Sequence, residues 1–425
     1  MNNVKTVTSN RLKNEYKVLK HKSGLTVYMF KMPKHSSAYA SVSTNYGSAN
    51  VNFGNTTSPY GVAHFLEHKL FQNQDGTDAF ELFAETGANA NAFTSFEKTS
   101  YLFSCTEDFE KNLEILLDFV FNPYFTKESV EKEKGIIAQE IKMYNDEAGW
   151  QVFVNLMKLL YHNHPIREDI AGSVQSISEI TPQTLYDCYK AFYHPSNMTL
   201  AVTGNFDESV VETLCDKIVK ETVPFETKLC ENNEPDQIKG SFYETQMDIS
   251  IPYFQIGFKG ENKGLLQNEI NSIYGEILTD ILVGDTSPLY EKLYNKGLIN
   301  DTFGGEVMSG SDFYVTVFSG ESKNPKLVYK KLKEKIRYYK KNGISDEDFE
   351  IAKRSLYGRY VRIFSRKSSV ASLLTSCHFS SLEMYDIIEK IAAAKKEDVE
   401  RILKETLICE KSALSVIKPK SKREG

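Results

Sequence analysis

The sequence contains no long hydrophobic run. No segment approaches the ~20 apolar residues that a membrane helix needs, and residues 1–6 lack the apolar core of a signal peptide. The six cysteines are scattered without C-x-x-C spacing, which argues against a disulfide framework and against a cysteine zinc site. Strong positive charge is also missing, because the net charge is −6, whereas nucleic-acid-binding domains are usually strongly basic. We therefore expect a cytoplasmic protein with no membrane span and no nucleic-acid partner.

Length and composition predict a large folded protein with more than one core. The chain has 425 residues, of which 41% are hydrophobic, and a single core stops growing beyond about 250–300 residues. Helix and strand patterns follow a similar order in the two halves, although no residue-level repeat is visible. We expect an α+β fold of two sheet-and-helix domains, 1–225 and 241–425, joined by a polar linker at 226–240.

The most informative motif is His64-x-x-Glu67-His68. Apolar residues at helical spacing surround it, and Ser58-Pro59 upstream predicts a capped helix start with proline in the first turn. Residues four apart lie about one turn apart on a helix, so both imidazoles can bind one metal ion. Glu67 would then flank a metal-bound water as a general base.

Chance is an alternative explanation of this motif. A chain with eight histidines would contain such a five-residue pattern by accident in roughly one case in a hundred. The motif alone therefore leaves open an ordinary half-exposed helix that carries two histidines by coincidence.

A third ligand is expected on a later helix. A catalytic zinc ion usually has three protein ligands and one open position. The segment 127–144 has helical periodicity, and Glu140 stands within its apolar run, where a lone carboxylate is costly unless it is paired or coordinated. Glu133 lies two turns earlier on the same face and can accept a hydrogen bond from a ligating imidazole. An ordinary charged helix surface is the alternative.

At this point the chain resembles the insulinase-like inverted-zinc-motif peptidases (M16), which include the mitochondrial processing peptidases. The resemblance lies in four segments, namely 64–68, 91–99, Glu133 with Glu140, and 192–200. It implies that His64, His68 and Glu140 bind Zn²⁺, that Glu67 is the base, and that Glu133 supports the site. It is specific in the N-terminal half and rests on element order in the C-terminal half, where it implies a second domain of the same type.

Within the family, the chain is most similar to a bacterial two-gene group associated with 5-aminopentanol modification of elongation factor P, and it resembles the member of that pair that carries the motif. This resemblance implies a genetic association. It does not identify a substrate.

The segment Ala90–Thr94 is the expected substrate strand. A hairpin pattern follows it, and an exposed sheet edge can bind a peptide as an added strand. An ordinary core strand is the alternative. Asn91 and Ala92 match the family's substrate strand, so the resemblance implies substrate binding at Asn91, Ala92, Phe93 and Thr94.

One part of the family pattern is missing. Many members have an Arg and a Tyr, seven residues apart in the C-terminal domain, that help to bind substrate and to stabilise the oxyanion. The corresponding positions here are Leu293 and Asn300, within a residue or two, and Tyr294 is a possible surrogate. Loss of one oxyanion donor typically costs about 10²–10³ in turnover. We therefore predict a heterodimer with a paralogous subunit that lacks the zinc motif and supplies this pair.

Three functions remain open. The first is a zinc endopeptidase for unfolded or leader peptides, and the second is a zinc-bound but weakly active scaffold or peptide-binding subunit. The third is a zinc hydro-lyase or hydrolase for a small molecule. Nitrogen and oxygen ligands also accept manganese or cobalt. His162 and His164 form another candidate pair, but their spacing before a proline makes metal binding there improbable.

Overall fold

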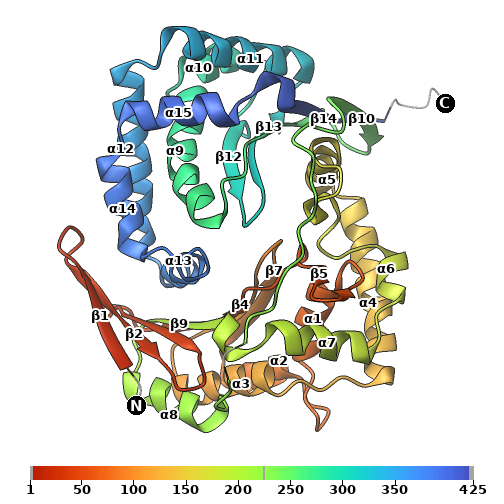
Figure 1. Ribbon diagram of the computed structural model, residues 1–425, viewed down its shortest axis with the longest axis vertical. Helices are drawn as coiled ribbons and strands as arrows, with labels where there is room; N and C mark the ends of the chain where they lie inside the picture. Colours follow the sequence, from red (N-terminus) through yellow and green to blue (C-terminus); the bar gives the residue numbers. More distant parts are fainter. Residues whose placement is uncertain (1–2, 224, 421–425) are drawn as a thin grey trace. The chain divides into compact units, whose positions relative to one another are not determined.

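The computed structural model describes residues 3–223 and 225–420, which form two compact units (Figure 1). The first unit comprises the described residues of Met1–Ile141, Asp169–Glu231 and Val361–Met384. The second comprises those of Lys142–Glu168, Asn232–Tyr360 and Tyr385–Gly425. Residues 142–168, from the N-terminal half of the chain, therefore belong to the second unit, and residues 361–384, from the C-terminal half, belong to the first. The boundaries 1–225, 226–240 and 241–425 remain a prediction about a duplicated domain.

The first unit contains a seven-stranded sheet in which β7 is an end strand. The order is β1(Asn3–Ser9), β2(Asn14–Lys20), β3(Thr26–Lys31), β9(Met198–Gly204), β4(Ala38–Thr44), β8(Thr99–Cys105) and β7(Asn89–Thr94). Neighbours are antiparallel except for β3 and β9. A separate short pair is formed by β5(Asn52–Phe53) and β6(Thr56–Thr57). The hairpin pattern predicted beside Ala90–Thr94 is confirmed, because β7 pairs with β8.

Helices lie on both faces of this sheet. The helices of the first unit are α1(Val62–Leu70), α2(Ala79–Glu85), α3(Phe109–Phe121), α4(Lys127–Asn145, which ends in the second unit), α6(Val174–Ser178), α7(Pro182–Phe192), α8(Glu208–Ile218) and α13(Lys367–Phe379). Alternate residues of β9 point to opposite faces. Leu200 and Val202 enter the core that contains α1. Thr203 faces α13, and its hydroxyl donates to the carbonyl of Lys367 over 3.0 Å.

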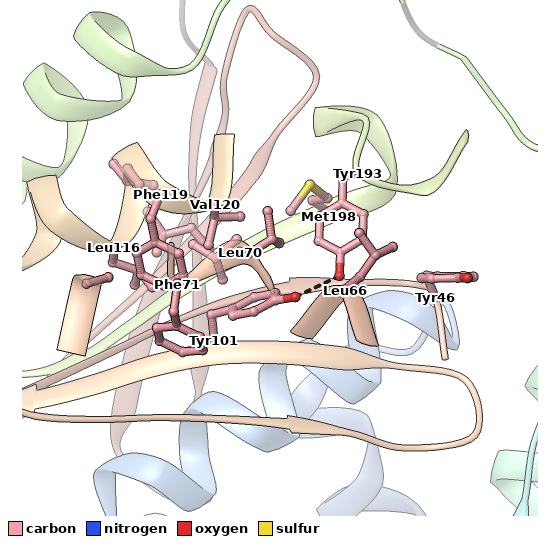
Figure 2. Close-up of a cluster of buried hydrophobic side chains, with 14 of the residues drawn as sticks. Tyr46, Leu66, Leu70, Phe71, Tyr101, Leu116, Phe119, Val120, Tyr193 and Met198 are labelled. Carbon is pink, nitrogen blue, oxygen red and sulfur yellow. Dashed lines mark hydrogen bonds between the residues drawn. The ribbon is translucent and has the colours of Figure 1, made fainter. Parts of the chain in front are cut away.

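The core anchors α1 by its apolar face (Figure 2). Phe65, Leu66 and Leu70 are at most 1% exposed, and full burial of each such side chain stabilises the fold by about 1.5–3 kcal/mol. Beneath the helix, the hydroxyls of Tyr101 and Tyr193 share a hydrogen bond of 2.8 Å. Because one face of α1 is fixed in this way, its polar face holds a constant position.

The start of α1 differs from the prediction. Its N-cap is Gly61, in the left-handed region with φ 92°, and no side chain caps it. A Cβ at Gly61 would lie 2.4 Å from the carbonyl oxygen of Ala171, so the close approach of that loop requires glycine. Ser58 is buried, and its N–H donates to the carbonyl of Val51 instead. The prediction of a Ser58-Pro59 start was therefore wrong.

The second unit contains a five-stranded sheet and its own helices. The strand order is β10(Phe242–Met247), β14(Ser412–Pro419), β11(Tyr253–Lys259), β13(Tyr314–Glu321) and β12(Gly304–Ser309). The helices are α5(Ala148–Leu160), α9(Leu265–Val283), α10(Pro288–Asn295), α11(Pro325–Asn342), α12(Asp346–Ile363, which extends into the first unit), α14(Met384–Ala393, which begins there) and α15(Lys396–Thr406). Among the described residues, the helices are too short or too polar to cross a membrane.

Helix α5 packs closely on β11 at Gly257. A Cβ there would lie 2.7 Å from Cδ1 of Leu160. This contact explains why a helix from the N-terminal half belongs to the second unit.

Candidate metal centre

Helices α1 and α4 bring His64, His68 and Glu140 together. Nε2 of His64 lies 3.6 Å from Oε1 of Glu140, and Nε2 of His68 lies 3.4 Å from Oε2 of the same carboxylate. The two imidazole rings are 4.6 Å apart between centroids. One potential ligand atom from each of the three residues lies within 4.8 Å of the other two. Two nitrogens and one carboxylate oxygen form a donor set that suits a zinc ion with one open position.

Glu133 sets the orientation of His68. Its Oε1 lies 3.1 Å from Nδ1 of His68, so Nε2 is the ring nitrogen that faces Glu140. Burial alone would raise the pKa of Glu133, but the bond to His68 and the charge of Lys69 outweigh it, and the pKa is lowered. Burial would lower the pKa of His68, but the bond to Glu133 and the charges of Glu67 and Glu140 outweigh it, and the pKa is raised. Glu133 therefore lies where the sequence predicts a supporting carboxylate.

His64 is the more enclosed ligand candidate. It is 8% exposed, and its Nδ1 is buried with no hydrogen-bond partner among the described residues. The other ring nitrogen, Nε2, lies 3.6 Å from Oε1 of Glu140. The buried ring therefore directs Nε2 at the shared centre, where it could bind a metal ion.

Glu67 lies beside this centre and is held by the edge strand. The hydroxyl of Thr94 on β7 donates to Oε2 of Glu67 over 2.6 Å. Glu67, His68, Asn91 and Ala92 line a pocket of about 470 Å³. A carboxylate with one oxygen held by a hydroxyl has its other oxygen available for proton transfer.

Strand β7 presents the expected edge. It pairs with β8, from Asn89 opposite Ser104 to Thr94 opposite Thr99, and it is the last strand in the order. Asn89, Asn91 and Phe93 are exposed, whereas the three alternate residues are half-buried. The structure thus places all four predicted substrate-binding residues, Asn91 to Thr94, on an edge strand next to Glu67.

Lys69 is a residue of the centre that the motif analysis missed. It is 2% exposed. Its Nζ lies 2.6 Å from Oε1 of Gln72 and 3.6 Å from Oε2 of Glu133. Burial lowers the pKa of Lys69, against the raising effect of Glu133. The sequence did contain a signal for the burial of Lys69, because this lysine stands three residues after Leu66, on the apolar face of α1.

The other predicted positions lie in the second unit. Nε2 of His164 contacts Oδ1 of Asp312 at 2.7 Å, and its Nδ1 accepts from the N–H of Ile166. These bonds engage both ring nitrogens of His164 and give it a structural role.

The two positions that correspond to the family's Arg and Tyr pair are Leu293 and Asn300. Leu293 is buried, and the amide of Asn300 donates to Glu321 over 2.7 Å. Tyr294 is 52% exposed and stacks on Tyr290. The correspondence of Leu293 and Asn300 to the family's pair stays a prediction from the sequence.

Comparisons with known proteins identify the family to which this chain is similar. The family model for insulinase (peptidase family M16) matches residues 26–174, and the model for the peptidase M16 inactive domain matches residues 179–356. YmfH, an uncharacterized zinc protease of Bacillus subtilis, is 36% identical over 418 residues, which are 95% of this chain and 96% of that protein. An uncharacterized zinc protease of Rickettsia felis is 25% identical over 405 residues, which are 91% of this chain and 94% of that protein.

Solved structures share the fold. An M16-like peptidase from Alicyclobacillus acidocaldarius superposes with a TM-score of 0.92 at 31% identity, covering 97% of this chain and 100% of that one. A protease from Helicobacter pylori has a TM-score of 0.82 at 20% identity, with 95% and 99% covered. The predicted two-domain α+β fold is therefore confirmed, and the chain belongs to the M16 (insulinase) peptidase family.

Proposed function

We propose that this protein is a zinc-dependent endopeptidase that hydrolyses unfolded peptides or leader peptides. The observation that carries the proposal is the convergence of His64, His68 and Glu140, with Glu67 beside them and an edge strand next to Glu67. The names of the relatives as zinc proteases support it. The cytoplasmic location remains a prediction from the sequence.

Each residue of the centre has a task that follows from its contacts. Nε2 of His64, Nε2 of His68 and the Glu140 carboxylate would hold the ion, and Glu133 keeps His68 in the required orientation. A bound zinc ion supplies Lewis acidity, which polarises a carbonyl group and makes water more acidic. Glu67 would accept the proton of the attacking water and return it to the leaving amine, a transfer typically worth about 10²–10⁴-fold.

Strand β7 provides the means of holding a substrate backbone. An extended peptide added beside β7 would receive main-chain hydrogen bonds, which are largely independent of side-chain identity. Asn91 and Ala92 border both this edge and the pocket next to His68. A peptide on this edge would therefore pass the base and the metal ligands.

A second candidate is a weakly active scaffold or peptide-binding subunit. Leu293 and Asn300 favour it, since neither can replace an Arg and a Tyr in stabilising an oxyanion. In the endopeptidase proposal, by contrast, this chain is the catalytic subunit of a heterodimer, and a paralogous subunit without the zinc motif supplies the missing pair. The resemblance to the group associated with elongation factor P modification is consistent with such a pair.

Quenched peptides distinguish the two candidates. Wild type and Glu67→Gln are assayed alone and mixed with the paralogous subunit, with metal content measured in parallel. The endopeptidase proposal predicts cleavage by wild type that Glu67→Gln loses by at least 10²-fold while keeping its metal. Glu128→Gln, an exposed acid in the first turn of α4, is the matched control and should cleave like wild type. Undiminished cleavage by Glu67→Gln would overturn the assignment of the base, and no cleavage by wild type with its partner would favour the scaffold.

A further inference from the structure

The role of His64, His68 and Glu140 as candidate metal ligands does not explain why the Lys69 side chain is buried. Its side chain is almost fully buried one residue after His68. An ammonium group is costly to bury unless other groups pair with it. The closest partners of its Nζ are Oε1 of Gln72 at 2.6 Å and Oε2 of Glu133 at 3.6 Å.

Glu133 is held from two sides as a result. Its Oε1 lies 3.1 Å from Nδ1 of His68, and its Oε2 faces Lys69. A carboxylate contacted at only one oxygen can rotate about its terminal torsion, which is broad. Contacts at both oxygens restrict that rotation and keep Oε1 directed at the imidazole.

We propose that Lys69 is a positioning residue of the metal centre, which acts through Glu133 to keep Nε2 of His68 directed at the ion. The chain of contacts runs from Gln72 to Lys69, Glu133 and His68, so that α1 contributes both the ligand and the cation that steadies its supporting carboxylate. The inference rests on the metal centre of the proposed function, and it adds a residue outside the H-x-x-E-H motif.

A purely structural role for Lys69 makes a different prediction. If its burial served only the core, removing it would lower stability and would affect metal binding independently of Glu133. If it acts through Glu133, its loss should cost metal affinity only while Glu133 is present. A double-mutant cycle separates these cases.

The experiment measures Zn²⁺ affinity of the full-length protein by competition with a chromogenic chelator. Four proteins complete the cycle: wild type, Lys69→Met, Glu133→Gln and the double variant. Residues that orient a metal ligand typically contribute 10–100-fold to affinity. We expect about a tenfold loss for Lys69→Met, at least as large a loss for Glu133→Gln, and no further loss in the double variant. Lys69→Arg should recover part of the affinity, because it restores a cation beside Glu133.

Lys132→Met is the matched control, since Lys132 is an exposed lysine next to Glu133 in sequence. It should stay within about twofold of wild type if contact with Glu133 is what matters. Thermal unfolding of the metal-free proteins reports any loss of structure, and Lys69→Gln replaces Lys69→Met if the latter does not fold.

Wild-type affinity in Lys69→Met, or independent and additive losses in the double variant, would refute the positioning role while leaving the metal centre intact. Absence of Zn²⁺ binding by wild type would remove the centre itself, and both proposals with it.

Discussion

The hydrogen bond between Thr94 and Glu67 allows a sharp test of how the edge strand supports the proposed base. Thr94→Val replaces the hydroxyl by a methyl group of similar size and keeps the β-branched shape that suits a strand. It removes the 2.6 Å donor to Oε2 of Glu67. A hydrogen bond to a charged group contributes about 1.5–3 kcal/mol, which corresponds to about 10- to 150-fold in rate if it is fully used in the transition state. We expect kcat/KM to fall by this factor.

The assay combines cleavage of a quenched peptide with metal analysis. Metal content should be unchanged in Thr94→Val, because the ligand atoms that converge belong to His64, His68 and Glu140, whereas the hydroxyl of Thr94 donates to Glu67. Thr94→Ser is the matched control, since it keeps the hydroxyl and should retain most activity. The reasoning fails if Thr94→Val cleaves at the wild-type rate, or if Thr94→Ser loses as much activity as Thr94→Val.

Two further predictions concern stability. Gly61→Ala should lower the melting temperature and weaken metal binding, because an added Cβ would lie 2.4 Å from the carbonyl oxygen of Ala171 at a φ of 92°, and the start of α1 or the loop at Ala171 must shift to relieve the clash. Calorimetry and chelator competition measure both effects, and a wild-type result would contradict the strain. Burial, followed by the charge of Lys20, lowers the pKa of His378 from 6.5 to about 4, and Nδ1 of this ring is bonded to the hydroxyl of Tyr28. As pH falls, the unfolded chain therefore protonates His378 at a higher pH than the folded chain does, so stability should decrease from about pH 6.5 to 4. Denaturant midpoints of wild type and His378→Gln over this range should converge at low pH, and parallel profiles would refute the assignment.

The local spacing of apolar residues was sufficient to predict many helices and strands of the first unit. The apolar spacing around Leu66 predicts α1, and the alternation around residues 88–105 predicts β7 and β8. The H-x-x-E-H order then places two imidazoles on one face, because helical geometry relates residues four apart without reference to the rest of the chain. The seven-residue spacing of Glu133 and Glu140 works in the same way, and the structure brings Glu140 to the two histidines.

Elements without a clear local pattern were missed. Strand β12 begins with two glycines and lacks regular alternation, and it forms because β13 supplies its hydrogen bonds. Helix α13 is rich in serine, which has a modest helix propensity, and packing against β9 and β4 stabilises it. The exchange of residues 142–168 and 361–384 between the units depends on contacts such as that of Leu160 with Gly257.

The sequence by itself determined that two imidazoles lie one helical turn apart on one segment and that Glu133 and Glu140 lie two turns apart on another, which is information that covalent order and backbone periodicity carry. The tertiary structure decided that the two segments meet. Only the tertiary structure decided that Thr94 holds Glu67, that Gly61 starts α1 and that a buried Lys69 steadies Glu133. Each of these depends on atoms that are far apart along the chain, or on a backbone conformation imposed by a neighbouring loop, and no periodicity of residue types encodes such distances.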